Sequence, residues 1–345
     1  MALPLALPIE PMLARSVPNI PEGRPGEFAY EPKWDGFRCI VARDGDHVDL
    51  WSRSRKRLTE YFPDVADAAR RHLPPQVVLD AELIVRTGAT GAERLDWEAL
   101  SLRIHPARKR VVERAALTPA ELVCFDLLAL ADVDLTSLPQ ATRRDALAQV
   151  VGGMADAGVH LSRTTNDAAE ARAWFERFEG AGLDGVVAKP TASPYAPGRR
   201  TMLKVKHERT AEAVVIGYGR SRSGHGVGSL HLGLYTSGVL VPVGGIGALP
   251  DAARAQLVDA LAPLVLTGSE ADAAPAPAQL TRAGVRDFVP LRPELVVEVA
   301  FDQLEGARFR HAVTFRRWRP DRDPESCLLD QIERAPAYDL ADVLG

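Results

Sequence analysis

Short hydrophobic runs alternate with helical patterns through the first 206 residues of the chain. Runs of strand character, with a period of two or continuously apolar, occupy Phe37 to Val41, Val48 to Trp51, Val77 to Val85, Glu121 to Leu128 and Gly185 to Lys189. Helical patterns occupy Tyr61 to His72, Arg143 to Val150, and Ala168 to Glu179 after the capping candidate Asn166. This order predicts an α+β or α/β domain in which strand ends and turns converge on a cleft.

The pattern changes after Lys206. Short strand-like segments separated by glycine-rich turns occupy Val214 to Tyr218, Leu230 to Tyr235, Val239 to Val243, Leu295 to Phe301 and Ala312 to Trp318. Such segments are typical of a small β-barrel. The Ala/Pro-rich stretch 268–280 predicts a flexible surface excursion from it. We therefore expect two domains, 1–206 and 207–345.

Composition is compatible with this division. A chain of 345 residues exceeds what one hydrophobic core usually supports, and 46% hydrophobic with 26% charged residues is ordinary for a globular protein. The net charge of −4 argues against nucleic acid covering the whole surface but allows a local basic groove. Three well-separated cysteines lack zinc or disulfide spacing, and no apolar stretch has the length of a membrane span. These features predict a cytoplasmic protein.

The candidate chemistry begins in the octapeptide from Glu31 to Arg38. Lys33 stands two residues before Asp35-Gly36 and five before Arg38. A neighbouring cation and a desolvated pocket both lower the pKa of a lysine, so a lysine in this setting can act as a covalent nucleophile at neutral pH. Alone, Lys-x-Asp-Gly arises by chance in many proteins, and an exposed lysine before a turn would be the favoured interpretation.

Six further segments change that balance because they follow in a definite order. They are Ser52-Arg53, Leu79 to Leu83, Cys124 to Leu128, Gly182 to Lys189, Leu203 to Lys206 and Phe315 to Arg322. Together with the octapeptide they resemble the motifs of covalent nucleotidyltransferases, most closely the bacterial ATP-dependent DNA ligases of the short stand-alone C type. The resemblance extends from Pro11 to Gln331. It implies an α+β nucleotidyltransferase (adenylation) domain with mixed sheets and flanking helices, followed by a C-terminal OB-fold β-barrel.

The same resemblance implies the reaction and its residues. Lys33 would take AMP from ATP and pass it to the 5′-phosphate of a nick, and AMP would leave when the 3′-hydroxyl attacks. The resemblance implies that this chemistry serves DNA repair. The implied nucleotide contacts are Glu31, Arg38, Arg53, Glu82, Phe125, Val187, Lys189, Lys204 and Lys206. Asp184 and Glu82 are the implied ligands of Mg²⁺ or Mn²⁺. The family more often has Glu at the position of Asp184 and Gly at that of Ala81, and the shorter Asp184 favours contact with the metal through water.

Several of these residues have a physical rationale and a plainer alternative. Lys204 and Lys206 project from one face of a strand and suit the negative charge of departing pyrophosphate, although an exposed strand face explains an isolated pair. Phe125 suits stacking on adenine opposite Val187, or core packing. The planar fork of Arg53 suits a phosphate, or a surface ion pair.

The last motif lies in the second predicted domain, far in sequence from Lys33. The resemblance implies that its charged residues close over the β and γ phosphates of ATP and then withdraw by a hinge motion. These residues are Arg317, Arg319, Asp321 and Arg322, the last of which is usually Lys in the family. A basic loop with Arg220 and Arg222 predicts part of a DNA groove, with a solvated loop as its alternative.

Two other classes remain open on sequence alone. An RNA ligase or a capping guanylyltransferase shares Lys-x-Asp-Gly and the OB domain, and a non-catalytic nucleic-acid-binding relative would keep the fold without the adduct. The favoured interpretation expects nicked duplex DNA as the partner, no membrane, a monomer and a nucleoid-associated cytoplasmic location. A repair polymerase or an end-binding protein is the candidate protein partner.

Overall fold

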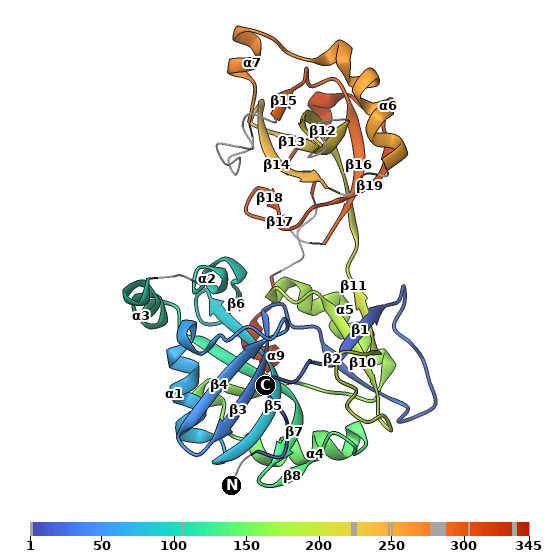
Figure 1. Ribbon diagram of the computed structural model, residues 1–345. Helices are drawn as coiled ribbons and strands as arrows, with labels where there is room; N and C mark the ends of the chain where they lie inside the picture. The colour runs from blue at the N-terminus through green and yellow to red at the C-terminus, as the bar shows by residue number, and fades with distance from the viewer. Residues whose placement is uncertain are drawn as a thin grey trace. The chain divides into compact units, whose positions relative to one another are not determined.

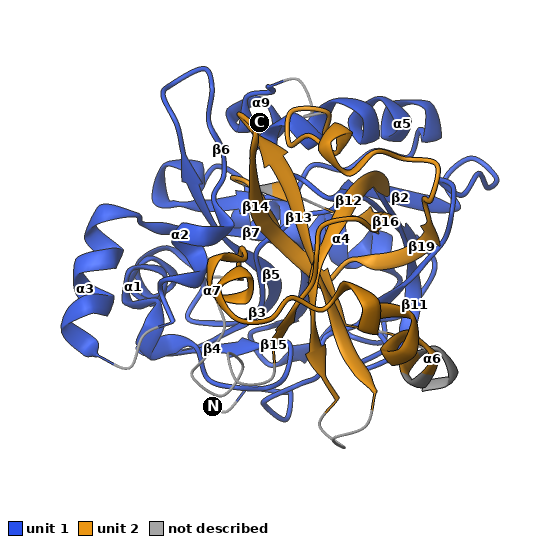
Figure 2. Cartoon of the chain, turned by 90° about the horizontal axis from the view of Figure 1, so that it is seen from above, with its two compact units in different colours: residues 1–206, 335–345 blue, residues 207–334 orange. Residues whose placement is uncertain are grey.

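The computed structural model describes residues 3–104, 107–221, 226–247, 249, 251–276, 288–302, 304–332 and 337–344. Its internal contacts divide the chain into two compact units, and the break falls between Lys206 and His207. The first unit contains residues 1–206 and 335–345, and the second contains residues 207–334 (Figures 1 and 2). Each unit is described by itself.

A seven-stranded sheet forms the main layer of the first unit (Figure 1). Its strands are β3 (Phe37–Asp44), β4 (His47–Ser52), β5 (Gln76–Thr87), β6 (Arg94–Leu95), β7 (Ala120–Leu130), β8 (Val133–Asp134) and β9 (Val159–Leu161). The order is β4-β3-β5-β7-β8, with β6 paired to β5 and β9 paired to β7. All these pairs are antiparallel except β7 with β9. The continuous apolar run in β7 is buried along nearly its whole length, as its sequence predicts.

A second, four-stranded sheet of the first unit places the octapeptide. It consists of β1 (Leu13–Ser16), β2 (Phe28–Pro32), β10 (Gly185–Pro190) and β11 (Arg200–Lys206), in the order β1-β11-β10-β2. Val187 on β10 lies opposite Glu31 on one side and Lys204 on the other. Just past the end of β2, the Lys33 N–H donates to the Gly185 carbonyl, and the Asp184 N–H donates to the Lys33 carbonyl. The register therefore fixes Lys33 beside Asp184.

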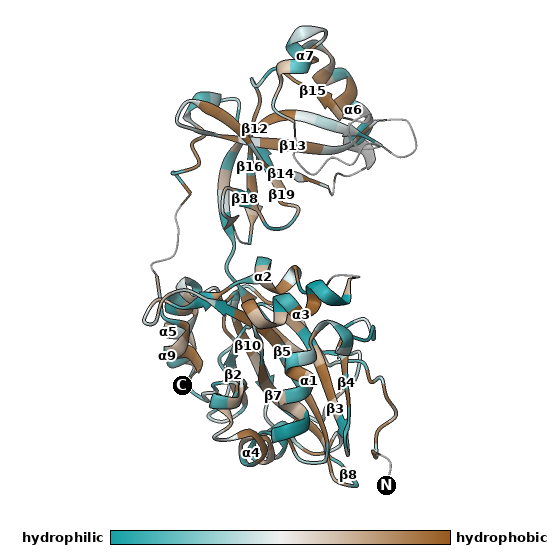
Figure 3. Cartoon of the chain, turned by 90° about the vertical axis from the view of Figure 1, so that its left-hand side faces the viewer, coloured by the Kyte–Doolittle hydropathy of each residue, from teal (hydrophilic) through white to brown (hydrophobic). Residues whose placement is uncertain are grey.

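Helices cover the first unit. They are α1 (Pro63–His72), α2 (Trp97–Ser101), α3 (Arg108–Leu117), α4 (Gln140–Val151), α5 (Ala168–Arg177) and the short C-terminal α9 (Leu340–Leu344), with 3₁₀ turns at Thr59–Tyr61, Ala155–Ala157 and Phe178–Ala181. The cap of α5 differs from the prediction, because the Asp167 carboxylate, one residue after Asn166, accepts the Ala169 N–H. Helix α3 has no predicted counterpart, since Val111 is its one buried residue and its periodicity is weak. Figure 3 shows the contrast between hydrophobic strands β5 and β7 and the hydrophilic surface of α1.

The end of the chain differs from its predicted placement. The sequence assigned everything after residue 206 to the second domain, but the last residues belong to the first unit. Leu340 and Val343 are fully buried there, in a cluster that includes Trp34 and Phe178. One helical turn presents too few apolar positions for its sequence to reveal which core it joins.

The second unit contains a six-stranded antiparallel sheet. Its strands are β12 (Arg209–Arg220), β13 (Val227–Thr236), β14 (Val239–Ile246), β15 (Phe288–Pro290), β16 (Val296–Phe301) and β19 (Thr314–Trp318), in the order β14-β13-β12-β16-β19 with β15 also paired to β12. A hairpin of β17 (Leu304–Glu305) and β18 (Arg308–Phe309), the helices α6 (Asp251–Leu261) and α7 (Ser269–Ala273), and 3₁₀ turns at Ala262–Leu264 and Pro324–Ser326 complete it. The predicted excursion thus contains a helical turn, and its residues 277–280 lie outside the described residues. Among the described residues, no helix combines the length and apolar character needed to cross a membrane.

Candidate active site

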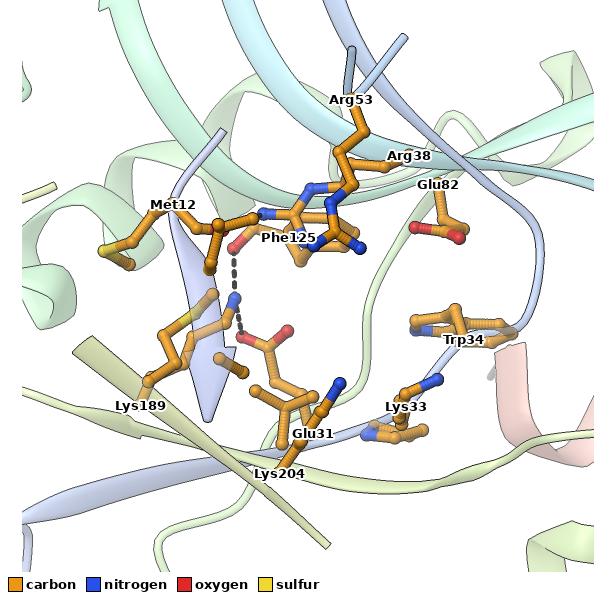
Figure 4. A pocket seen from close by; sticks show the side chains of 15 residues that line it. Met12, Glu31, Lys33, Trp34, Arg38, Arg53, Glu82, Phe125, Lys189 and Lys204 are labelled. Carbon is orange, nitrogen blue, oxygen red and sulfur yellow. Dashed lines mark hydrogen bonds and ion pairs between the residues drawn. The ribbon is translucent and has the colours of Figure 1, made fainter. Parts of the chain in front are cut away.

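A pocket of about 170 Å³ lies in the first unit, lined by strands of both of its main sheets (Figure 4). Its walls bring together nine of the residues singled out from the sequence: Glu31, Lys33, Arg38, Arg53, Glu82, Phe125, Val187, Lys189 and Lys204. Lys206 and Asp184 do not line the pocket. The Asp184 carboxylate contacts the amines of both Lys33 and Lys206. Segments as far apart in the sequence as Met12 and Lys204 therefore converge on one cavity.

Lys33 and Lys206 share the carboxylate of Asp184. Both amines contact Oδ2, at 2.6 Å for Lys33 and 2.8 Å for Lys206. Burial disfavours the ionised carboxylate, but the two ammonium groups outweigh it and hold the pKa of Asp184 below its ordinary value. Oδ1 of Asp184 is buried without a hydrogen-bond partner. A buried carboxylate oxygen with no partner is costly, and so this oxygen is an open ligand position beside Lys33.

The close approach of β5 explains why a glycine stands at position 36, the end of the Lys-x-Asp-Gly motif. A Cβ at this position would lie 2.0 Å from the Leu83 carbonyl oxygen, so no other residue fits without moving β5. The close approach lets the Gly36 N–H donate to Oε1 of Glu82 at 3.1 Å. Burial raises the pKa of Glu82 to about 7, against the opposing effect of Arg38 and Lys33. Near neutral pH this carboxyl is therefore poised between its acid and its carboxylate.

Arg38 is held by a partner that sequence reasoning missed. Its guanidinium forms a two-pronged ion pair with Asp80, at 2.5 and 2.6 Å, and Asp80 is fully buried. Burial opposes the charge of Arg38, but Asp80 outweighs it and raises the pKa of the guanidinium. The Tyr195 hydroxyl donates to Asp80 at 2.5 Å and accepts the Met12 N–H at 2.9 Å. Asp80 stands two residues before Glu82 on β5, on the same face, and that spacing was the available signal.

The other end of the pocket combines an aromatic ring with a buried ion pair. Lys189 lies 2.8 Å from Oε1 of Glu31 and donates to the Phe125 carbonyl at 2.9 Å. The Phe125 ring has the Arg38 guanidinium 4.4 Å and the Lys189 amine 4.8 Å from its centroid. Since each buried charge is paired, the polar groups here are pre-organised around an apolar surface.

Cations dominate the remaining wall. Burial, together with the charges of Lys206, Lys33 and Arg53, lowers the pKa of Lys204. Arg53 is exposed and reaches over the pocket, with no hydrogen bond or ion pair to any described residue (Figure 4). Mutual repulsion of this kind is relieved by an anion, and a polyphosphate is the anion that several converging cations suit.

Trp34 is a pocket residue that sequence reasoning left unassigned. It follows Lys33 directly, is 6% exposed, and its indole N–H donates to Oγ of Ser162 at 2.9 Å. Its position inside the octapeptide was the signal that could have singled it out. Met12 and Met202 add apolar lining from outside the recognised motifs.

The residues of the last motif form a charged cluster within the second unit. Arg317 pairs with Glu298 at 2.7 Å, and Arg319 binds Asp321 at 2.9 Å and also contacts Glu212. Hydrogen bonds from Arg319 lower the pKa of Asp321 to about 2. Arg322 is 3.5 Å from Oε1 of Gln331. Of the predicted DNA-contacting loop, Arg220 ends β12 with an exposed side chain, and Arg222 lies outside the described residues.

Comparison with known proteins places this site in a family. Residues 11–206 match the model of the ATP dependent DNA ligase domain, and residues 223–322 match that of the ATP dependent DNA ligase C terminal region. DNA ligase C of Mycobacterium tuberculosis H37Rv is 48% identical over 362 residues, covering 100% of this chain and 99% of the relative. DNA ligase C2 of Mycolicibacterium smegmatis is 47% identical over 355 residues, covering 97% of each. A solved chain from a study of Lig E DNA ligases matches with a TM-score of 0.56 at 17% identity, covering 90% of this chain and 99% of that one, and supports the fold alone.

The chain belongs to the ATP-dependent DNA ligases. It is a nucleotidyltransferase that uses ATP, and among its relatives it is similar over its whole length to the mycobacterial C-type ligases. The predicted fold class is confirmed: a mixed α+β nucleotidyltransferase domain precedes a C-terminal OB-fold domain. The predicted activity, sealing of nicks by adenylation, is confirmed at the level of the family.

Proposed function

We propose that Lys33 is the residue that becomes adenylated. The observation that carries this proposal is the position of its amine, at a pocket rich in cations and 2.6 Å from the Asp184 carboxylate. The neutral amine attacks the α-phosphorus of ATP, a P–N bond forms, and the bond from that phosphorus to the bridging oxygen breaks. Pyrophosphate departs with that oxygen, and the amine proton passes to Asp184 or to water.

The pocket supplies a matching place for each part of ATP. Adenine lies between Phe125 and Val187, with the Glu31 and Lys189 pair reading its polar edge. Glu82 binds the ribose hydroxyls, for which a carboxyl with a pKa of about 7 can either donate or accept. Arg53, Lys204 and Lys206 neutralise the charge that builds up on the phosphates in the transition state.

A divalent cation, Mg²⁺ or Mn²⁺, fits beside Lys33 only with help from the substrate. Within the described residues no group of three His, Cys, Asp or Glu side chains is arranged to hold a metal. The unpartnered Oδ1 of Asp184 provides one protein oxygen, and Glu82 a second, with ATP phosphates and water as the remaining ligands. When bound, the ion would neutralise phosphate charge during transfer.

The two domains divide the work. We assign residues 1–206 to adenylation and the strands after residue 207 to a mobile OB domain, whose Arg317, Arg319, Asp321 and Arg322 orient the β and γ phosphates. The three arginines suit that task because guanidinium groups pair with phosphate oxygens, and the ionised Asp321 holds Arg319 at 2.9 Å. The DNA substrate is a nicked duplex, which the exposed basic segment from Arg53 to Arg57 suits. We further propose that the enzyme serves DNA repair in the cytoplasm, near the nucleoid. We expect it to act as a monomer, together with a repair polymerase or an end-binding protein.

Labelling with α-³²P-ATP tests the central assignment. The protein should retain an acid-labile label through denaturing electrophoresis, and peptide mapping should place it on Lys33. Lys33→Ala should lose the label, and the control Lys109→Ala should keep it. Lys109 is 89% exposed and pairs only with Glu113 among the described residues. Labelling from GTP in place of ATP would indicate a guanylyltransferase. Absence of any adduct would indicate a non-catalytic relative.

A further inference from the structure

The last described residues of the chain pack on the unit that holds Lys33, although 128 residues of the other unit, 207–334, intervene in the sequence. We call residues 337–344 the C-terminal segment. Its helix α9 alternates buried and exposed positions, with Leu340 and Val343 inside and Ala341 and Asp342 outside. The spacing of three residues puts both apolar side chains on one face.

Hydrogen bonds hold the C-terminal segment at two separate places. The Glu93 N–H donates to Oδ1 of Asp339 at 3.1 Å, and the Leu340 N–H donates to the Glu93 carbonyl at 2.9 Å. At the other end, Arg163 donates to the Asp342 carbonyl at 2.7 Å. These reciprocal and terminal bonds fix the direction of the segment as well as its position.

The apolar face of the C-terminal segment enters the core that supports the pocket. Leu340 and Val343 are each 0% exposed and belong to one cluster with Trp34, Phe125 and Leu183. Trp34 and Phe125 line the pocket, and Leu183 directly precedes Asp184. In Figure 4 the pale red ribbon of the chain's end lies beside Trp34. In a well-packed core, the loss of a methyl group shifts the neighbouring side chains, so the position of the pocket wall depends on these two residues.

A second route also leads from the segment to Trp34. Arg163, which binds the Asp342 carbonyl, is adjacent to Ser162. The Ser162 hydroxyl accepts the indole N–H of Trp34, and the Ser162 N–H donates to the Cys124 carbonyl next to Phe125. The polar and the apolar contacts of the segment thus converge on the same two aromatic residues.

We propose that the C-terminal segment is a positioning element of the adenylation pocket, in which Leu340 and Val343 are positioning residues that fix Trp34 and Phe125. The proposal rests on the assignment of this pocket to ATP and Lys33. Neither residue lines the pocket, and both act through the aromatic walls. Because adenylation needs its reacting atoms aligned, a small shift of these walls is expected to cost more in catalysis than in folding.

The test compares two matched double variants. Leu340→Ala with Val343→Ala removes apolar groups from the C-terminal segment. Leu147→Ala with Val151→Ala removes the same groups from α4, whose residues are 0% and 1% exposed in a core with no pocket-lining member. Nick-sealing rates across a range of ATP concentrations give KM and kcat, and circular dichroism sets a temperature at which both variants are folded.

The C-terminal variant should raise KM for ATP and lower kcat/KM by roughly tenfold or more, while the α4 variant keeps the wild-type KM. If both variants keep it, or both raise it equally, the positioning role is wrong. Should the C-terminal variant fail to fold, Arg163→Ala replaces it, because this half-buried side chain can be removed with little loss of packing. It should raise KM by a smaller factor, and an unchanged KM overturns the proposal. Wild-type protein that forms no adduct would instead refute the assignment of the pocket to ATP.

Discussion

The amine of Lys33 lies 2.6 Å from Oδ2 of Asp184, and the carboxylate on which it rests also binds Lys206 at 2.8 Å. The arrangement solves two problems of a lysine nucleophile. It keeps two ammonium groups close together without net repulsion, and it aims the lysine amine at one side of the pocket. One oxygen of Asp184 stays free of both lysines, so a cation can approach without displacing them.

Replacement of Asp184 separates charge from shape. Asp184→Asn keeps the size but removes the charge that balances two lysines, and should slow self-adenylation by roughly a hundredfold. Asp184→Glu restores the charge and the residue more common in the family, and should recover most of the rate. Single-turnover labelling with ATP measures both. Equal rates for Asn and Glu would show that the carboxylate charge is unimportant.

Removal of the nucleophile should affect one chemical step and spare another. Lys33→Ala should abolish ATP labelling and nick sealing, yet still join pre-adenylated nicks, because the attack of the 3′-hydroxyl needs no enzyme amine. The assay supplies DNA already carrying AMP on its 5′-phosphate. Normal labelling of the variant would refute the role of Lys33.

How much of the fold and of the site the sequence predicts depends on how far apart in the sequence the interacting residues lie. Strands β3, β5 and β7 carry strong local patterns, and the pocket residues sit in motifs at fixed spacing, so both could be anticipated. The Asp80 partner of Arg38 lies 42 residues away, and its place two residues before Glu82 on β5 is a weak local signal for that contact. The C-terminal segment is harder still, because one helical turn carries no periodicity that indicates its distant core. Contacts between residues far apart in the sequence produce little pattern in the sequence around either residue.

The raised pKa of Glu82 predicts an unusual dependence of stability on pH. With a pKa of about 7 against an ordinary 4.5, the folded protein binds more protons at this site than the unfolded chain does between those values. The raised pKa of Glu82 therefore contributes up to about 3 kcal/mol to the free energy of unfolding below pH 4.5, and this contribution is lost as pH rises through 7. Glu82→Gln cannot titrate, so its stability relative to wild type should increase across that window. Urea unfolding from pH 4.5 to 8 measures the difference, and parallel curves would contradict the shift.

The cluster in the second unit should matter mainly for the first chemical step. Arg319→Ala and Asp321→Ala should impair self-adenylation at least about tenfold more than sealing of pre-adenylated nicks, since only the first step has pyrophosphate to orient. Arg292→Ala removes a more exposed ion pair of the same kind, with Glu294 at 2.8 Å in the same unit, and should change neither step. Equal losses in both assays would exclude an action on pyrophosphate.

Tyr195 offers a test of whether the support of Arg38 is functional. Its hydroxyl lies between the Asp80 carboxylate, at 2.5 Å, and the Met12 N–H, at 2.9 Å. Tyr195→Phe leaves both groups short of a partner in a buried site, at a cost of about 1–3 kcal/mol, and frees Asp80 to draw Arg38 away from the pocket. Tyr30→Phe is the matched control, because the Tyr30 hydroxyl donates at 2.6 Å to the Pro21 carbonyl and touches no pocket residue. Both variants should lose thermal stability, but only Tyr195→Phe should raise KM for ATP several-fold. If KM rises equally in both, the hydroxyl of Tyr195 serves folding alone, and Arg38 keeps its place through Asp80 without help.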